Sequence, residues 1–136
     1  MAGGDLNAEY DCSGLLKQLF QCFGIYLPRN GAEQAAASSL AHSFREQDQR
    51  EQLIKTKGIA AASLLRFPGH IMLYLGSIEG RAYALHALYG YSQPSAQGDR
   101  IVKVNKTVVS DLSLGEGSAR KSLLQRLSGI YQVCIP

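Results

Sequence analysis

Cys12 lies in the segment best suited to nucleophilic chemistry, Asp11-Cys12-Ser13-Gly14. Apolar residues follow it at helical spacing, so we predict a helix from about Cys12 to Phe23 with Asp11 as its N-cap. A cysteine in the first turn of a helix lies near the positive end of the helix dipole, which favours the thiolate. The N–H groups of that turn lack intrahelical partners and can bind a developing oxyanion. The alternative is an inert, buried thiol, and these four residues alone favour neither interpretation.

Two histidines are spaced so that a β-hairpin can bring their rings together. His70 opens one predicted strand, His86 lies in the next, and their positions differ by an even number. Side chains alternate between the two faces of a strand, so a hairpin centred on Ile78 places both rings on one face. One ring can then orient the other, as in a nucleophile–base–orienting group triad. This geometry requires an odd loop, because an even loop separates the rings unless a bulge restores the register.

Composition and charge narrow the class of protein. The chain has 136 residues, of which 46% are hydrophobic and 18% charged, which predicts one globular domain. The net charge is +3, and no basic run is interleaved with aromatic residues, so nothing indicates a nucleic-acid-binding protein. No apolar stretch reaches the roughly 18 residues of a membrane span, and the N-terminus lacks the pattern of a signal peptide. The spacing of the three cysteines matches no zinc site.

The pattern of the chain predicts an α+β fold, in which N-terminal helices pack on an antiparallel sheet. Beyond the helix of Cys12, we expect helices over 32–44 and 47–57 and a helical turn over 122–126. The strands are expected over 64–67, 70–76, 81–87, 101–104, 107–111 and 130–135. His42 falls at a polar helix end in this scheme and is interpreted as a surface residue.

Four ordered segments give the chain a resemblance to NlpC/P60 cell-wall peptidases, which have a papain-like fold. They are DCSG at 11–14, GIYLPRNGAEQ at 24–34, PGHIMLYLG at 68–76 and YALHA at 83–87. The later stretch VVSDLSLGEGSARKSLLQRL at 108–127 is similar to the subgroup that follows bacterial SH3-like domains. The resemblance implies one catalytic domain over residues 1–136. We expect this domain to be truncated on its N-terminal side, where only Gly3-Gly4 resembles the family's Tyr- and Trp-containing segment.

The resemblance implies a role for each site residue. Cys12 matches the nucleophile, His70 the general base and His86 the third polar residue that orients His70. Asp11 and Ser13 match residues that contact the free amine end of a peptidoglycan stem peptide.

Arg29 also matches a position near the substrate, in the pattern LPR…Q that ends at Gln34. We favour a structural role for both side chains, with Arg29 tying a loop beside the site. No metal or other cofactor is implied.

Three functions stay open at this point. The first is a cysteine endopeptidase that cuts the γ-D-glutamyl–diamino acid bond of the stem peptide. The second is an amidase or acyltransferase that uses the same Cys-His pair, because an acyl-enzyme does not dictate its acceptor. The third is a truncated, non-catalytic remnant that binds wall peptide. The resemblance places all three in the bacterial envelope, periplasmic or secreted, with SH3-like domains as possible neighbours in a longer parent protein.

Overall fold

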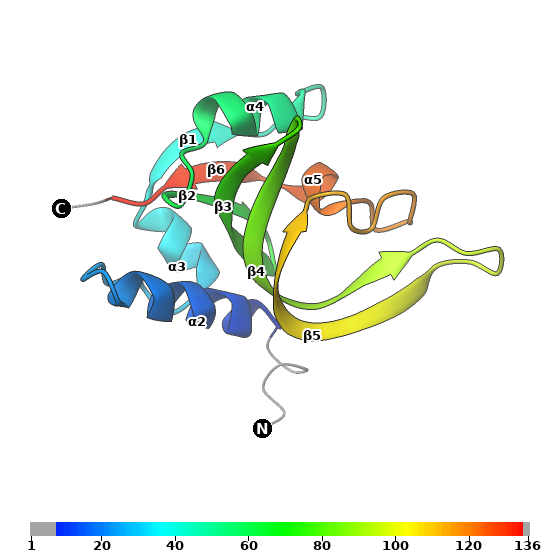
Figure 1. The fold of residues 1–136 in the computed structure, drawn as a ribbon, viewed down its shortest axis with the longest axis horizontal. Helices are drawn as coiled ribbons and strands as arrows, with labels where there is room; N and C mark the ends of the chain where they lie inside the picture. Colours follow the sequence, from blue (N-terminus) through cyan, green and yellow to red (C-terminus); the bar gives the residue numbers. More distant parts are fainter. Residues whose placement is uncertain (1–7, 135–136) are drawn as a thin grey trace.

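The computed structural model describes residues 8–134, with side chains from Cys12 onward (Figure 1). The elements are α2 (Ala8–Gln21), α3 (Gly31–Ala36), β1 (Ser39–Ser43), α4 (Arg50–Lys57), β2 (Ser63–Phe67), β3 (His70–Ile78), β4 (Arg81–Gln93), β5 (Arg100–Asp111), α5 (Leu123–Arg126) and β6 (Gly129–Gln132). Of the four helices within residues 8–134, three precede β2, and the main run of strands follows. The predicted α+β class is therefore confirmed.

Six antiparallel strands form one sheet in the order β1-β6-β2-β3-β4-β5. The sheet separates two apolar clusters. One joins Cys12, Leu16 and Phe20 of α2 to Leu64, Ile71 and Leu73 of β2 and β3. The other joins Ile54 of α4, Leu123 of α5 and Leu127 directly after α5 to Leu65, Met72 and Tyr74 on the opposite side of the same strands. Alternation along each strand therefore gives α2 one face of the sheet and α4 and α5 the other.

The helix of Cys12 begins earlier than predicted. The chain is already helical at Ala8, the first described residue, so Asp11 lies inside the helix and is not its N-cap. Nothing in Ala8–Tyr10 breaks a helix, because the segment contains neither Gly nor Pro. Because residues from Ala8 onward are helical, Cys12 lies at least one turn inside the helix, where the helical pattern pairs its N–H with the carbonyl of Ala8. The predicted oxyanion site at the N–H of Cys12 is wrong for this reason.

The Ala-rich second helix is shorter than predicted. It ends at Ala36, and Ser39–Ser43, expected to be helical, form strand β1. These residues pair with β6, whose backbone groups supply the partners that a helix would supply internally. His42 consequently belongs to a strand and is half-buried, which corrects its placement at an exposed helix end.

Strands β4 and β5 form a long hairpin, whose outer part extends away from the helices in Figure 1. β5 is one continuous strand, where two separate strands had been predicted. The break that Asn105 indicated is a bulge, with Asn105 at a φ of 51°. Gly90 pairs with Lys103 next to this bulge, and a Cβ there would lie 2.7 Å from the carbonyl oxygen of Val102. The close pairing of these strands therefore requires glycine at position 90.

Candidate active site

His70 and His86 form a direct hydrogen bond, with Nε2 of His70 2.8 Å from Nδ1 of His86. Their ring centroids are 5.0 Å apart and the rings are nearly perpendicular. His86 is fully buried, and His70 is 7% exposed. The expectation that both rings share one face of the sheet is confirmed.

The register that brings the rings together differs from the one predicted. The loop between β3 and β4 has two residues, Glu79 and Gly80, with φ angles of 51° and 82°. Positive φ at both positions is the signature of a type I′ turn. The expected odd loop centred on Ile78 is therefore wrong, and the two-residue loop alone would separate the rings.

A bulge restores the shared face. Gly76 pairs with Tyr83 and Tyr74 pairs with Ala84, so Leu75 has no partner on β4. Gly76 adopts a φ of 130°, which residues with a Cβ rarely adopt. Because of this extra residue, the side chains of β3 before Leu75 point to the opposite face from the one that the two-residue loop alone would give. His70 therefore lies on the same face as His86.

Ser110 of β5 extends the pair into a chain of three polar side chains. Its Oγ lies 2.8 Å from Nε2 of His86. Ser110 pairs with Ala84, two residues before His86, so its side chain reaches His86 diagonally across the strands. The sequence interpretation missed Ser110. Ser110 falls in the strand predicted over 107–111, but identifying its partner required the register between β4 and β5.

Both histidines are neutral at pH 7 in this geometry. Burial, the neighbouring charge of His86 and that of Arg126 lower the pKa of His70 from 6.5 to about 3. Burial alone lowers the pKa of His86 from 6.5 to about 4. A neutral imidazole donates through one nitrogen and accepts through the other. The direction of the His70–His86 hydrogen bond therefore depends on the direction of the His86–Ser110 hydrogen bond.

Arg126 and Phe67 flank His70. The Phe67 and His70 ring centroids are 5.4 Å apart, and the guanidinium carbon of Arg126 lies 4.1 Å from the Phe67 centroid. Burial, followed by the charge of Arg120, lowers the pKa of Arg126 below its ordinary value. Sequence reasoning missed Arg126 as well, because its proximity to His70 comes from the packing of α5 beneath the sheet.

Cys12 is fully buried and belongs to the same apolar cluster as Ile71, the residue after His70. Since neighbouring side chains of a strand alternate, His70 starts from the other face of β3. The described contacts of its ring are with Phe67 and His86. The thiol therefore faces the sheet as predicted, in the cluster that includes Ile71, the residue after His70.

Ser13, Arg29 and Gln34 meet beside Cys12. Nη1 of Arg29 lies 3.5 Å from Oγ of the buried Ser13, and its guanidinium lies over Gly14. The buried Gln34 donates through Nε2 to the carbonyl oxygens of Ser13 and Pro28, each at 2.9 Å. Gln34 thus ties the Pro28 loop to the helix turn that carries Cys12, the structural role that was favoured. The side chain of Asp11 lies outside the described residues, as do Gly3 and Gly4.

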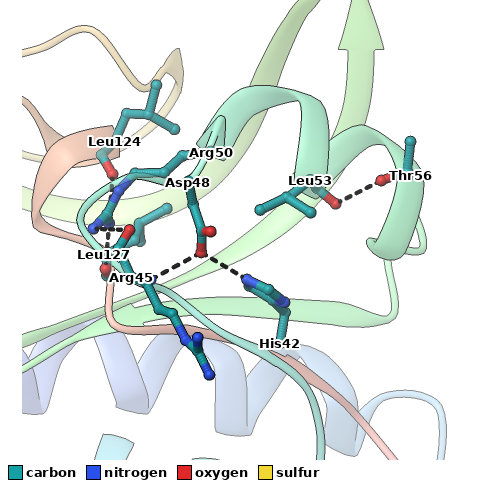
Figure 2. Close-up of polar contacts among 8 residues, drawn as sticks. All are labelled: His42, Arg45, Asp48, Arg50, Leu53, Thr56, Leu124 and Leu127. Carbon is teal, nitrogen blue, oxygen red and sulfur yellow. Dashed lines mark hydrogen bonds and ion pairs between the residues drawn. The ribbon is translucent and has the colours of Figure 1, made fainter.

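A second polar cluster lies away from these residues, beside the start of α4 (Figure 2). Oδ2 of Asp48 lies 2.8 Å from Nε2 of His42 and accepts a hydrogen bond of 2.8 Å from the N–H of Arg45. Arg50 donates to the carbonyl oxygens of Leu127 and Leu124, at 2.5 and 3.3 Å. Asp48 thus ties the β1–α4 loop to β1, and Arg50 ties the start of α4 to α5 and the residue after it. We interpret these contacts as structural.

The other two cysteines lie away from the core. Cys22 and Cys134 are both exposed. The α2 helix ends at Gln21, so Cys22 follows it in a turn, and β6 ends at Gln132, before Cys134. Cys12 is thus the buried cysteine on the helix face next to the sheet.

Comparison with known proteins identifies the family. The sequence model of the NlpC/P60 family matches residues 1–112. The chain belongs to the NlpC/P60 family. Among the curated proteins, a search found no match. The match ends just after β5, so α5 and β6 lie beyond the matched part, although β6 occupies a position within the sheet.

A solved NlpC/P60 endopeptidase from Photobacterium damselae subsp. piscicida has a similar structure. The TM-score is 0.76 and the sequence identity 26%. The similarity covers 90% of the present chain and 33% of that protein, so this NlpC/P60 chain spans about a third of its neighbour. Within residues 8–134, no helix is both long and apolar enough to cross a membrane.

Proposed function

We propose that this NlpC/P60 chain is the catalytic domain of a cysteine endopeptidase that cleaves peptidoglycan stem peptides. The bond is the one between γ-D-glutamate and the diamino acid. Cys12 is the nucleophile, His70 the general base and His86 the residue that orients His70. The observation that carries the proposal is the 2.8 Å hydrogen bond between the two histidines, in a chain of this family.

The bond to His86 engages Nε2 of His70, which leaves Nδ1 as the nitrogen that takes the proton of Cys12. The thiolate attacks the carbonyl carbon of the scissile bond, and the imidazolium of His70 then protonates the leaving amine. A water molecule attacks the resulting thioester while His70 takes its proton, and the thiol leaves with that proton. His86 keeps the ring of His70 in one orientation through both steps.

Burial disfavours the imidazolium of His70, so the mechanism requires a compensating negative charge beside it. The thiolate of Cys12 is that charge. His70 is the first residue of β3 and lies at the end of the sheet, directly after a two-residue loop. The proposal requires that Nδ1 of His70 and Sγ of Cys12 lie within hydrogen-bond distance in the reacting complex.

The remaining assignments concern the substrate, the location and the neighbouring domains. Ser13 and Asp11 contact the amine end of the stem peptide, and Arg29 positions the turn that carries Ser13. The site of action is the bacterial envelope. We also propose SH3-like domains as neighbours of the catalytic domain in a longer parent protein.

Mass spectrometry of peptidoglycan fragments tests the activity. We expect the wild-type chain to release fragments with a new amine at the diamino acid, and Cys12→Ala to release none. Cys22→Ala is the matched control and should cleave like the wild type, because Cys22 is exposed and follows the end of α2. His70→Ala should lower kcat/KM by about 10²- to 10⁴-fold, the usual contribution of a general base.

Two outcomes would contradict the proposal. Cleavage by Cys12→Ala at the wild-type rate excludes Cys12 as nucleophile. A wild-type chain that binds stem peptide and leaves every bond intact is a non-catalytic binding module. Iodoacetamide labelling at pH 7 adds an independent measurement: Cys12 should react, and His70→Ala should slow the reaction, because the unassisted thiol has a pKa of about 8.5.

A further inference from the structure

Ser110 closes a hydrogen-bonded chain that crosses three neighbouring strands. Nε2 of His70 meets Nδ1 of His86, and Nε2 of His86 meets Oγ of Ser110, each at 2.8 Å. Ser110 pairs with Ala84 in the β4–β5 ladder, so the strand next to it sets its position. Its neighbour Asp111 accepts a hydrogen bond of 3.1 Å from Arg81 on β4.

Two arrangements of protons fit this chain, because a neutral imidazole has one donor and one acceptor and a hydroxyl can act as either. In the first, His86 donates through Nε2 to Ser110, so its Nδ1 accepts from Nε2 of His70. Nδ1 of His70 is then bare. In the second, Ser110 donates to His86, all directions are reversed, and Nδ1 of His70 carries a proton. Only the first arrangement lets His70 accept the proton of Cys12.

Protonation of His70 imposes the same direction. An imidazolium donates through both nitrogens, so Nδ1 of His86 must accept and the proton of neutral His86 must be on Nε2. That N–H is buried, and in the described part of the chain its partner is the hydroxyl of Ser110. An unpartnered buried donor is costly, so loss of the hydroxyl would specifically disfavour the state in which His70 works as a base.

We propose that Ser110 is a positioning residue: its hydroxyl accepts a hydrogen bond from Nε2 of His86 and thereby holds His70 in the tautomer with a bare Nδ1. This inference rests on the proposed function, since it assigns how the base of that reaction is prepared. Ser110 acts through His86 and has no contact with the reacting atoms.

The matched variants are Ser110→Val and Ser110→Thr, which have the same shape and β-branching and differ in the hydroxyl. Ser110→Val should lower kcat/KM for stem-peptide cleavage by about 10- to 100-fold, which corresponds to one unpartnered buried donor. Ser110→Thr should restore most of the rate. The loss should fall on kcat with KM little changed, because the substrate does not touch Ser110.

Nitrogen-15 NMR of the histidine rings tests the inference without any activity. In the wild type, both His70 and His86 should carry their proton on Nε2 at pH 7, and Ser110→Thr should keep this pattern. Ser110→Val should shift His86 toward the Nδ1–H form. Wild-type His86 protonated on Nδ1, or a tautomer pattern that Ser110→Val leaves unchanged, would overturn the role of Ser110. An inactive wild type with the expected tautomers would instead overturn only the proposed function.

Discussion

His86 meets His70 diagonally across β3 and β4, and the unpaired Leu75 produces this relationship. Without Leu75, the two-residue turn at Glu79-Gly80 would direct the two rings to opposite faces of the sheet. The bulge therefore determines whether a histidine pair exists at all.

Gly76→Ala tests the bulge. The φ of 130° at Gly76 is strained for any residue with a Cβ, so we expect a loss of about 1–3 kcal/mol in the free energy of unfolding. Urea denaturation measures it. Gly98→Ala is the matched control, because Gly98 has a φ of 102° in an exposed loop with open space around it. Gly76→Ala should reduce cleavage far more than Gly98→Ala, and equal activity in the two variants would contradict the importance of the bulge.

The pH dependence of stability follows from the two buried histidines. Their pKa values are about 3 and about 4 in the folded chain and near 6.5 when unfolded. Between these pKa values the unfolded chain binds protons that the folded chain does not bind. The contribution of the two histidines to the free energy of unfolding is therefore fully present above about pH 6.5 and is lost as the pH decreases. Each histidine should contribute a slope of about 1.4 kcal/mol per pH unit.

Urea denaturation between pH 7 and pH 5 measures this slope. His86→Gln removes one titrating group, so the decrease on acidification should become clearly smaller. A slope that His86→Gln leaves unchanged would show that the acid sensitivity arises elsewhere in the chain.

Arg126→Met tests the electrostatic environment of His70. The charge of Arg126 acts after burial and His86 to lower the pKa of His70, so its removal should raise that pKa. Methionine keeps an apolar stem over Phe67 and thus limits the loss of packing. An NMR titration of the His70 ring measures the shift. Arg120→Met removes an exposed charge that does not act on His70, and a shift of equal size in that variant would contradict the assignment.

Gln34→Met tests the tie between the Pro28 loop and α2. The substitution keeps the side-chain length and leaves the carbonyl oxygens of Ser13 and Pro28 without the amide donor. We expect a loss of about 2 kcal/mol or more in the free energy of unfolding, measured by urea denaturation. Gln52→Met, at an exposed position of α4, should change stability by less than about 0.5 kcal/mol. Equal effects of the two substitutions would remove the structural role of Gln34.

Much of the fold could be predicted, because it depends on local patterns such as the helical stripe after Cys12. The pairing of His70 and His86 was predicted from their even spacing, but the odd loop assumed for it is wrong, and the bulge at Leu75 restores the shared face. Residues 39–43 could not be predicted in the same way. Their alanine and leucine residues favour a helix, and pairing with β6, distant in sequence, overrides that preference.

Ser110 and Arg126 show a second limit of sequence interpretation. Each acts on a histidine from a different element, so its role depends on the register between strands or on how α5 packs. The spacing of residues within a single element carries no information about such contacts. The position of Asp11 inside α2 is a third case, since an acidic residue can occupy either the N-cap or the first turn of a helix.

The position of β6 has a consequence for how this domain forms during its synthesis. β1 is bonded to the rest of the sheet through β6, which lies between β1 and β2. While the ribosome still holds the last residues of the domain in its exit tunnel, β2–β5 can assemble as a hairpin array, but β1 has no strand to join. The sheet therefore closes only after the end of the domain has emerged, and until then the exposed edges of β1 and β2 are available to chaperones or to other nascent chains.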